Sequence, residues 1–265
     1  MGSIIAVINN KGGVGKSTIT TNLAAALGTS QGGVLVVDLD PQCDSTDNLG
    51  EPNIPQKQSL WQLLSDGMAG EDVDISKFVT VTDSRGVMLL PNHVETAWIE
   101  AELYSDIPKN FLLLRKLLRE YASKNYQFTI LDTPPNMGVY VTMAMAAADL
   151  VLVPVDAGSK RAIKGLSRAI TTIGEVQETI NPGLKFLRLI INRIDKRTAI
   201  SKAVIQQLND RFGKDLICSA MIPSNTAIQQ AEAAGKTVLS YAPNSKGSQQ
   251  FRALAKEIAE ISGRD

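Results

Sequence analysis

Short apolar runs recur along the chain, and most are followed by a longer stretch in which apolar residues return at helical spacing. Runs rich in valine, isoleucine and leucine favour strands. The predicted strands are Ile4–Ile8, Val34–Val37, Val87–Leu90, Phe128–Leu131, Leu150–Val153 and Leu187–Ile191. Because these runs are almost continuously apolar, we expect helices to cover the strands on both faces, as in a parallel sheet.

The stretches between the strands predict helices. These are Ser17–Leu27, Phe111–Lys124, Ile163–Thr179, Ala199–Phe212, Thr226–Gly235 and Ser248–Ile261. The alternation predicts an α/β fold with a doubly wound, mostly parallel sheet flanked by helices. We expect a single domain over residues 1–265, with a less regular insertion at about 44–86, where Pro52 and Pro55 precede the short amphipathic piece Ser59–Leu64.

The composition is ordinary, but the distribution of charge is not. The 265 residues are 44% hydrophobic and 20% charged, which is typical of a globular protein. The 27 lysines and arginines balance the 27 acidic residues over the whole chain. Residues 1–150, however, hold 10 basic and 17 acidic residues, and residues 151–265 hold 17 and 10. A chain without net charge can therefore carry a basic face in its C-terminal half.

The cysteines and the histidine argue against a zinc site. Cys43 and Cys218 are far apart in the sequence, and His93 is the one histidine, so the usual set of Cys and His ligands cannot form. No apolar run reaches the roughly 20 residues that span a bilayer, and we expect no stable membrane association. Trp61 and Trp98 flank apolar residues, which indicates packing in the core or at an interface.

The residues after the first predicted strand form a candidate phosphate-binding loop. Residues 9–18 read NNKGGVGKST and lie directly before a predicted helix. Glycines in such a loop let backbone N–H groups turn towards a phosphate, the helix N-terminus adds a positive dipole, and a lysine and a hydroxyl group reach the phosphates and Mg²⁺. The predicted nucleotide-binding residues here are Lys11, Gly12, Gly13, Val14, Gly15, Lys16, Ser17 and Thr18.

The loop departs from the pattern G-x-x-x-x-G-K-[ST] at its first glycine. Asn10 stands there instead, and Lys11 adds a second cation beside Lys16. KGGVGKST resembles the deviant Walker A box of the ParA/Soj/MinD group of ATPases. The resemblance continues in order through DLDPQ at 38–42, ILDTPP at 130–135, INR at 191–193, the 221–237 stretch with IP and AEAAGK, and YAPNSKG at 241–247.

This resemblance implies ATP and Mg²⁺ as cofactors and gives each box a role. The implied catalytic residues are Lys11, Lys16 and Asp40, with Asp40 orienting the attacking water. The implied Mg²⁺ ligands are Ser17, Asp38 and Asp132. The positions of the carboxylates agree with these roles, because all three aspartates end apolar strands, and ligands bind at the carboxyl ends of parallel strands.

The resemblance further implies that Asn192, Arg193 and Pro223 lie on the adenine side. It implies a homodimer when ATP is bound, in which Lys11 reaches the phosphates in the other subunit. A ParB-type centromere-binding protein or a cargo adaptor would trigger hydrolysis. Such ATPases bind non-specific DNA to segregate plasmids or chromosomes or to position a cargo, so the expected location is cytoplasmic and nucleoid-associated.

A basic segment provides a candidate DNA-binding face. Residues 185–214 hold eight basic and two acidic residues, and phosphate contacts from such residues make binding depend on salt. The predicted DNA-binding residues are Lys185, Arg188, Lys196, Arg197, Lys202, Arg211 and Lys214. Residues 224–235 lack the arginines that many chromosomal relatives have there, so a DNA face has to use other residues.

Other functions of similar proteins are open alternatives. A MinD-like membrane-cycling ATPase needs a basic amphipathic C-terminal helix. Here the last predicted helix has an apolar stripe, but acidic residues largely cancel its basic ones, which favours packing against the domain. An iron–sulfur carrier needs paired cysteines at an interface, and a biosynthetic ligase needs a substrate pocket that the sequence does not reveal. A binding module without activity is disfavoured by the lysines and carboxylates.

Overall fold

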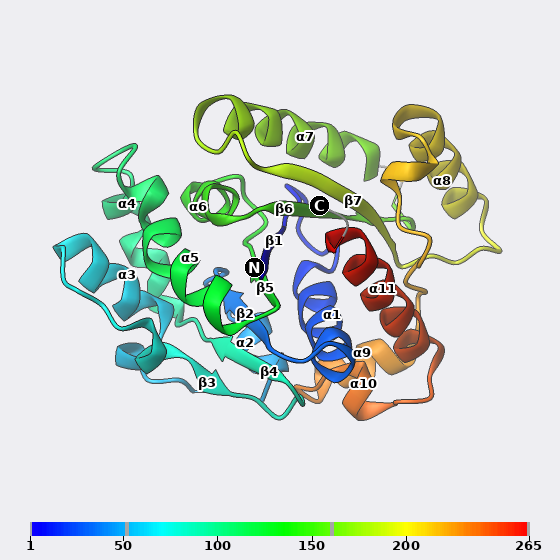
Figure 1. The fold of residues 1–265 in the computed structure, drawn as a ribbon. Helices are drawn as coiled ribbons and strands as arrows, with labels where there is room; N and C mark the ends of the chain where they lie inside the picture. The colour runs from blue at the N-terminus through cyan, green and yellow to red at the C-terminus, as the bar shows by residue number, and fades with distance from the viewer. Residues whose placement is uncertain (1, 51–52, 160–161, 264–265) are drawn as a thin grey trace.

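The computed structural model describes residues 2–50, 53–159 and 162–263. They form a seven-stranded sheet in the order β3-β4-β2-β5-β1-β6-β7 (Figure 1). The strands are β1 (Ser3–Val7), β2 (Val34–Asp38), β3 (Thr80–Val81), β4 (Val87–Leu90), β5 (Phe128–Asp132), β6 (Leu150–Asp156) and β7 (Lys185–Asn192). All neighbouring strands are parallel except β3 and β4. The predicted fold class is confirmed, with β3 as a short antiparallel edge strand that was not predicted.

The α-helices flank this sheet. They are α1 (Lys16–Ser30), α2 (Asp44–Asn48), α3 (Leu60–Ala69), α4 (Glu100–Leu103), α5 (Leu113–Asn125), α6 (Val139–Ala147), α7 (Ala162–Thr179), α8 (Ala199–Phe212), α9 (Thr226–Ala233), α10 (Val238–Tyr241) and α11 (Lys246–Ser262). Helix α6 was missed by the sequence analysis. Eight of its nine residues are buried, so it has no polar face and shows no helical periodicity.

Five short 3₁₀ helices complete the described elements. They are η1 (Gln56–Gln58), η2 (Ile75–Phe78), η3 (Val94–Ile99), η4 (Asn110–Leu112) and η5 (Lys214–Leu216). Residues 44–86 thus contain α2, η1, α3, η2 and β3. Leu63 and Leu64 of α3 are buried in the main core, and Gly67 lets α3 approach α5, because a Cβ at this position would lie 2.9 Å from a methyl group of Leu117.

Alternate residues of the central strand β1 point to opposite faces of the sheet. Ile4 and Ala6 belong to the core formed with α3, α5, α6, α7 and α8, whereas Ile5 and Val7 belong to the core formed with α1 and α9 to α11. Helix α1 lies between the sheet and α11 (Figure 1), so nearly all its residues are buried. The alternation explains why the strands read as continuous apolar runs.

Helix α11 packs against the domain, as predicted. Phe251, Leu254 and Ile258 of its apolar stripe are buried in the core that α1 shares. The polar side of the helix also makes a contact, because the Glu257 carboxylate accepts hydrogen bonds from the backbone N–H groups of Ser219 and Ala220. Among the described helices, none is both long and apolar enough to cross a membrane.

The parallel strands bring several polar residues to one edge of the sheet. Asp38 at the end of β2 is in register with Asp132 at the end of β5. Asp156 at the end of β6 is in register with Asn192 at the end of β7. The loop between β1 and α1 leaves the sheet at this same edge, which is where α/β sheets bind ligands.

Candidate functional site: a nucleotide pocket

A hollow of about 470 Å³ lies at the carboxyl edge of the sheet. Its lining comes from the loop before α1, the first turn of α1, the turn after β2, α2, the loop after β5 and single residues near β7 and on α9. These residues are Gly12, Gly13, Gly15, Lys16, Ser17, Thr18, Asp40, Gln42, Asp44, Asp47, Asn48, Pro135, Arg193 and Glu232. The predicted phosphate-binding loop therefore forms one wall of a pocket large enough for a small ligand.

The glycines of this loop set its shape. Gly13 and Gly15 have φ angles of +71° and +88°, which side chains disfavour. Gly15 also meets β7 closely, because a Cβ there would lie 2.3 Å from Asn192 Nδ2. Helix α1 starts at Lys16, so the first backbone N–H groups of α1, which lack partners within the helix, lie beside the pocket.

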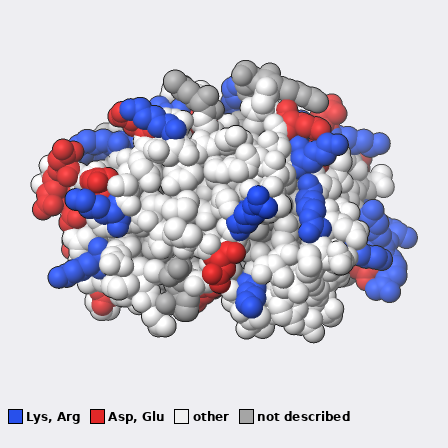
Figure 2. Space-filling view, turned by 60° about the horizontal axis from the view of Figure 1, so that its bottom comes forward, with Lys and Arg blue, Asp and Glu red and all other residues white. Residues whose placement is uncertain are grey.

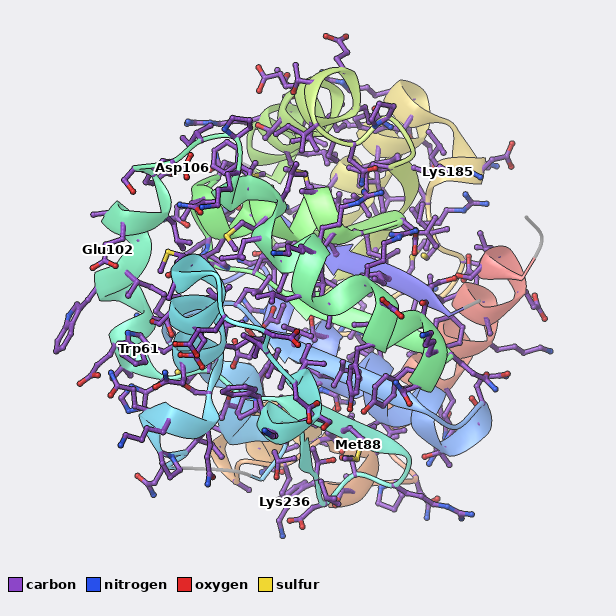
Figure 3. All side chains as sticks on the ribbon, turned by 60° about the vertical axis from the view of Figure 1, so that its left-hand side comes forward. Trp61, Met88, Glu102, Asp106, Lys185 and Lys236 are labelled. Carbon is purple, nitrogen blue, oxygen red and sulfur yellow. The ribbon has the colours of Figure 1, made fainter. Side chains whose placement is uncertain are left out.

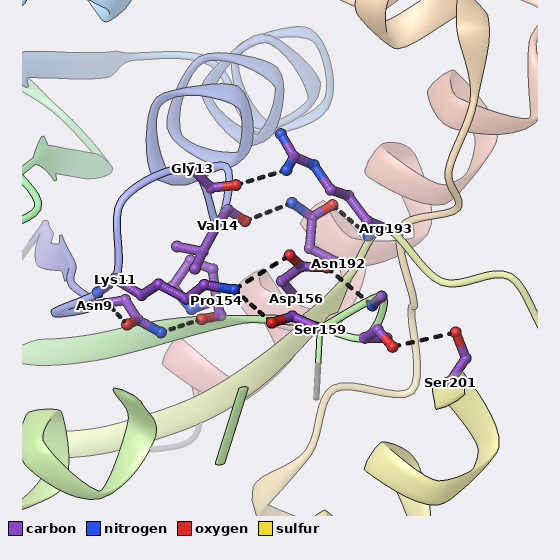
Figure 4. A network of polar contacts seen from close by, with 12 residues as sticks. Asn9, Lys11, Gly13, Val14, Pro154, Asp156, Ser159, Asn192, Arg193 and Ser201 are labelled. Carbon is purple, nitrogen blue, oxygen red and sulfur yellow. Dashed lines mark hydrogen bonds and ion pairs between the residues drawn. The ribbon is translucent and has the colours of Figure 1, made fainter. Parts of the chain in front are cut away.

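The end of β7 holds the loop from behind (Figure 4). Asn192 Nδ2 donates a hydrogen bond of 2.7 Å to the Val14 carbonyl oxygen. The Arg193 guanidinium donates one of 2.7 Å to the Gly13 carbonyl oxygen, from a left-handed backbone with φ of +53°. These contacts occupy two loop carbonyl groups, so the loop can present its N–H groups to an anion.

Asp38 and Asp132 form a buried pair behind the pocket, and neither is exposed. Asp38 Oδ2 accepts hydrogen bonds from the Thr46 N–H and hydroxyl, at 2.9 and 2.7 Å. Asp132 Oδ2 accepts one of 2.6 Å from the Ser45 hydroxyl. Burial raises the pKa of Asp132 to about 6, against the opposing effects of the Ser45 and Ser17 hydroxyls and of Lys16. Burial and the Asp132 charge raise the pKa of Asp38 as well.

Lys16 and Asp40 both line the pocket. Lys16 is 6% exposed, and burial lowers its pKa, while Asp132, Asp40 and Asp44 act in the opposite direction. Asp40 is held by its own turn, since its Oδ1 accepts a hydrogen bond of 3.0 Å from the Gln42 N–H. The pocket thus combines a buried cation with a fixed carboxylate.

Lys11 takes a different direction from Lys16. Its ammonium group donates a 2.7 Å hydrogen bond to Ser159 Oγ and lies 3.6 Å from Asp156 Oδ2, at the end of β6 (Figure 4). The Lys11 side chain is 32% exposed. Lys11 is not among the residues that line the pocket, so its charge lies on the rim and not beside the phosphate site of its own chain.

The structure places the other predicted site residues in two groups. Arg193 lines the pocket. Asn192 Nδ2 donates a hydrogen bond to the Val14 carbonyl oxygen, and Pro223 lies on a backbone bridge to Ile194. None of these three residues lines the pocket. The contact of Asn192 and Pro223 with adenine stays a prediction.

Six pocket residues were missed from the sequence. They are Gln42, Asp44, Asp47, Asn48, Pro135 and Glu232. Gln42, Pro135 and Glu232 belong to boxes already recognised, so their motifs were an available signal. Glu232 of α9 accepts a hydrogen bond from the Thr18 hydroxyl, a contact across most of the sequence that no local pattern indicates. Burial and the charges of Asp40, Asp47 and Glu232 raise the pKa of Asp44.

The donor set fits a hard divalent cation. Asp38, Asp132 and Ser17 offer only oxygen atoms, which Mg²⁺ prefers. Within the described residues no group of three or more His, Cys, Asp or Glu side chains is placed to hold a metal ion. A cation at this site therefore needs the Ser17 hydroxyl and phosphate oxygens to complete its shell, as is usual for Mg²⁺ bound with a nucleotide.

The predicted DNA-binding residues do not form one uniform surface. Lys196, Lys202 and Lys214 line a shallow hollow of about 510 Å³ on α8, which we call the basic hollow. Arg197 is paired with Asp195 at 2.8 Å, and Arg211 lies over the Phe212 ring. Lys185 and Arg188 come from the edge strand β7. On the face shown in Figure 2, basic and acidic side chains are scattered among uncharged ones, both near the middle and around the edge.

Both cysteine side chains are buried and free of disulfides. Burial raises the pKa of the Cys43 thiol to about 12, with Asp38 adding to the effect, and burial raises the pKa of Cys218 as well. Protonated thiols are poor metal ligands. The buried cysteines therefore give no support to the iron–sulfur alternative.

Comparisons with known proteins agree with this site. Residues 2–186 match the profile of the AAA domain family AAA_31, and residues 138–264 match that of the 4Fe-4S iron sulfur cluster binding proteins of the NifH/frxC family. The chain is 34% identical to the sporulation initiation inhibitor protein Soj of Bacillus subtilis, over 98% of this chain and 99% of that protein. It is 35% identical to the chromosome-partitioning ATPase Soj of Thermus thermophilus, over 96% of this chain and 94% of that protein.

The fold is also similar to solved structures. One is the cobyrinic acid a,c-diamide synthase of Mycobacterium smegmatis with a bound ATP analogue and magnesium. It has a TM-score of 0.82 and 29% identity, covering 100% of this chain and 97% of that one. The Soj relatives match at higher identity and along nearly their full length. The chain belongs to the Soj/ParA family of P-loop ATPases.

Proposed function

We propose that this ATPase binds Mg²⁺·ATP, closes into a homodimer around two nucleotides, binds DNA without sequence preference and releases it after partner-triggered hydrolysis. The observation that carries the proposal is the direction of its two loop lysines. Lys16 is buried in its own pocket, whereas Lys11 is partly exposed on the rim. A second loop cation that lies outside the pocket would suit binding to a phosphate group of the nucleotide held by a second subunit.

The pocket supports ATP as the nucleotide. The loop N–H groups and Lys16 would bind the phosphates, and Asp40 would orient an attacking water molecule. Ser17, Asp38 and Asp132 would hold Mg²⁺, which neutralises phosphate charge when bound. The similar synthase structure with an ATP analogue and magnesium supports the same assignment.

Lys11 is held weakly enough to be released. Its contacts are a hydrogen bond to Ser159 and a 3.6 Å approach to Asp156, and a partly exposed pair of this kind contributes at most about 1 kcal/mol. A charge-assisted bond to a phosphate is stronger. Dimer formation would therefore move Lys11 from Asp156 to the nucleotide of the other subunit.

The basic hollow supports DNA binding. Lys196, Lys202 and Lys214 lie together there, and the described side chains around them include one acidic residue, Asp210. Each subunit would contribute a few phosphate contacts, and a dimer doubles that number, which strengthens binding through avidity. We infer that a ParB-type protein or a cargo adaptor triggers hydrolysis, and that the protein works at the nucleoid in the cytoplasm.

Sedimentation velocity tests the dimer. With Mg²⁺·ATP under conditions that block hydrolysis we expect a dimer, and with Mg²⁺·ADP a monomer. A monomer in both states would overturn the proposal. Co-sedimentation with anionic vesicles tests the membrane-cycling alternative, for which the burial of the α11 stripe gives no support; strong ATP-dependent vesicle binding would favour that alternative instead.

A further inference from the structure

The segment from η3 to η4 exposes an unusual amount of apolar surface. The described residues include eight exposed large apolar side chains, and five of them lie between residues 94 and 112. They are Val94, Trp98, Tyr104, Ile107 and Leu112, with Trp98 73% exposed. We call this segment the 94–112 surface. Trp98 thus lies outside the core, and a concentration of exposed apolar side chains of this kind marks interaction sites.

The 94–112 surface is also acidic. It carries Glu95, Glu100, Glu102 and Asp106 against a single basic residue, Lys109, which lies 3.4 Å from Asp106. Glu102 and Asp106 lie at the outer edge of the molecule (Figure 3). Negative charge disfavours both DNA phosphates and anionic lipid, and it attracts a cationic protein segment.

Hydrogen bonds connect this surface to the nucleotide site. Thr46, whose hydroxyl donates to Asp38, accepts a 3.0 Å hydrogen bond from the Asn92 N–H. Asn92 Oδ1 in turn accepts one of 2.5 Å from the Thr96 hydroxyl, within η3. The buried Asn92 Nδ2 has no hydrogen-bond partner among the described residues. A shift of η3 therefore has a direct path to a carboxylate of the proposed Mg²⁺ site.

A second connection runs to the loop after β5. The Tyr140 hydroxyl, on α6, donates to the Thr96 carbonyl oxygen. Gly138 lies so close to α4 that a Cβ there would be 2.9 Å from Glu100 Oε1 and 3.4 Å from the Tyr104 hydroxyl. The 94–112 surface therefore contacts the segments that follow both β2 and β5, which end in Asp38 and Asp132.

We propose that the 94–112 surface binds a cationic amphipathic segment of the partner protein, and that the Thr46–Asn92–Thr96 hydrogen bonds transmit the effect of this binding to the nucleotide site. The proposal deepens the proposed function, and it rests on that function only for the effect on hydrolysis. No residue of the 94–112 surface lines the nucleotide pocket, so docking is measured separately from nucleotide binding.

Trp98 provides the probe. Trp61→Phe leaves Trp98 as the sole tryptophan, and its emission should move to shorter wavelength when a partner covers it. Three synthetic peptides are titrated without nucleotide: an amphipathic leucine/lysine helix, the same sequence with glutamate for lysine, and the same with serine for leucine. We expect a saturable shift with the leucine/lysine peptide alone. No shift with that peptide, or an equal shift with the glutamate peptide, would overturn the proposal.

Variants locate the contact. The double variant Glu102→Lys/Asp106→Lys should bind the leucine/lysine peptide with an affinity lower by roughly tenfold or more. The double variant Val94→Ser/Ile107→Ser should show the same loss of affinity. Tyr241→Ser, which removes an exposed apolar residue on α10, should leave binding unchanged. An emission shift on raising the protein concentration alone would identify a second copy as the occupant, and a shift with duplex DNA or anionic vesicles would identify those; each overturns the proposal.

Hydrolysis tests the connection. With Mg²⁺·ATP, saturating leucine/lysine peptide should change the turnover rate of wild type at least about twofold and leave that of Trp98→Ser at its basal value. If wild-type protein with normal ATP binding and basal hydrolysis binds the peptide without any change in turnover rate, that result would overturn the proposed connection between the 94–112 surface and the nucleotide site. A protein that binds no ATP would instead overturn the proposed function.

Discussion

The nucleotide pocket and the basic hollow both gather charged side chains, but they hold them in different ways. In the pocket, Lys16 and Asp40 are buried, and Asp40 is fixed by backbone hydrogen bonds. In the basic hollow, Lys202 and Lys214 are exposed on the surface of α8 and η5. Buried charges interact strongly and depend on geometry, whereas exposed charges are screened by salt. Substitutions in the pocket should therefore have steep effects, and substitutions in the hollow graded ones.

The largest effect is expected for Lys16→Ala. It removes the buried cation of the pocket and leaves phosphate charge without its partner, which costs about 3 kcal/mol or more, or roughly a hundredfold in Kd. Equilibrium titration with fluorescent ATP measures this loss. Lys77→Ala, at an exposed position on η2, is the matched control and should bind ATP as wild type does. Near-normal ATP binding by Lys16→Ala would contradict the assignment of the pocket.

Lys11→Ala should separate binding from dimer formation. Because Lys11 does not line its own pocket, the variant should bind ATP within about threefold of wild type, yet lose ATP-dependent dimerisation and stimulated hydrolysis. Asp156→Asn, which removes the charge that Lys11 faces, is the control and should still dimerise. A Lys11→Ala dimer with normal stimulated turnover would show that this lysine does not act between subunits.

Asp132→Asn should make the nucleotide-free protein more stable while removing Mg²⁺-dependent binding. Burial raises the pKa of Asp132 to about 6, above the ordinary value of 3.8, so the folded state binds the proton more tightly than the unfolded chain. The stability from this group is present below pH 3.8 and is lost as the pH rises through about 6. Wild type should therefore be less stable than the variant by about 3 kcal/mol at pH 8, with the difference shrinking towards pH 4.

Urea unfolding at several pH values measures this difference. The control is Asp72→Asn at an exposed position, where no buried charge is removed and the pH dependence of stability should stay close to that of wild type. A difference between wild type and Asp132→Asn that does not change between pH 8 and pH 4 would contradict the role of burial. Mg²⁺·ATP should narrow the difference at pH 8, because it binds wild type alone.

Alanine at Lys196 or Lys202 should have the smallest effect. Each substitution removes one exposed phosphate contact, so DNA binding should weaken a few-fold for all sequences alike, and the slope of log affinity against log salt should fall by about 1. Lys77→Ala again serves as the control. A loss confined to one DNA sequence, or a slope equal to that of wild type, would show that these lysines do not contact phosphates.

The same contrast explains how much could be predicted from the sequence. The phosphate-binding loop was predictable because a strand, glycines, a lysine and a helix follow one another directly in the sequence, and a phosphate site of this kind needs all four. The buried helix α6 was not, because burial on all sides removes the periodicity that marks a helix. Cys43 adopts a φ of +62°, a backbone conformation that favours glycine. Because a cysteine stands there, the sequence gives no sign of the left-handed turn before α2.

Long-range contacts limited the prediction of the site. Glu232 reaches Thr18 and Arg193 reaches Gly13 only because α9 and β7 fold back against the loop. For Trp98 the sequence left both the core and an interface open, since an apolar neighbourhood in sequence is typical of both a core and a surface patch. The predicted DNA-binding residues were found by counting charge, which does not reveal that Asp195 pairs with Arg197.

ATP-dependent dimerisation should make the basic hollow a DNA-binding face, and fluorescence anisotropy of a labelled duplex of arbitrary sequence measures this binding. The protein is titrated at low salt with Mg²⁺·ATP under conditions that block hydrolysis, and again with Mg²⁺·ADP. Two hollows on one dimer should bind at least about tenfold more tightly than one, so we predict binding with ATP and much weaker binding with ADP. Equal affinity in the two states, or no binding with ATP, would contradict the account.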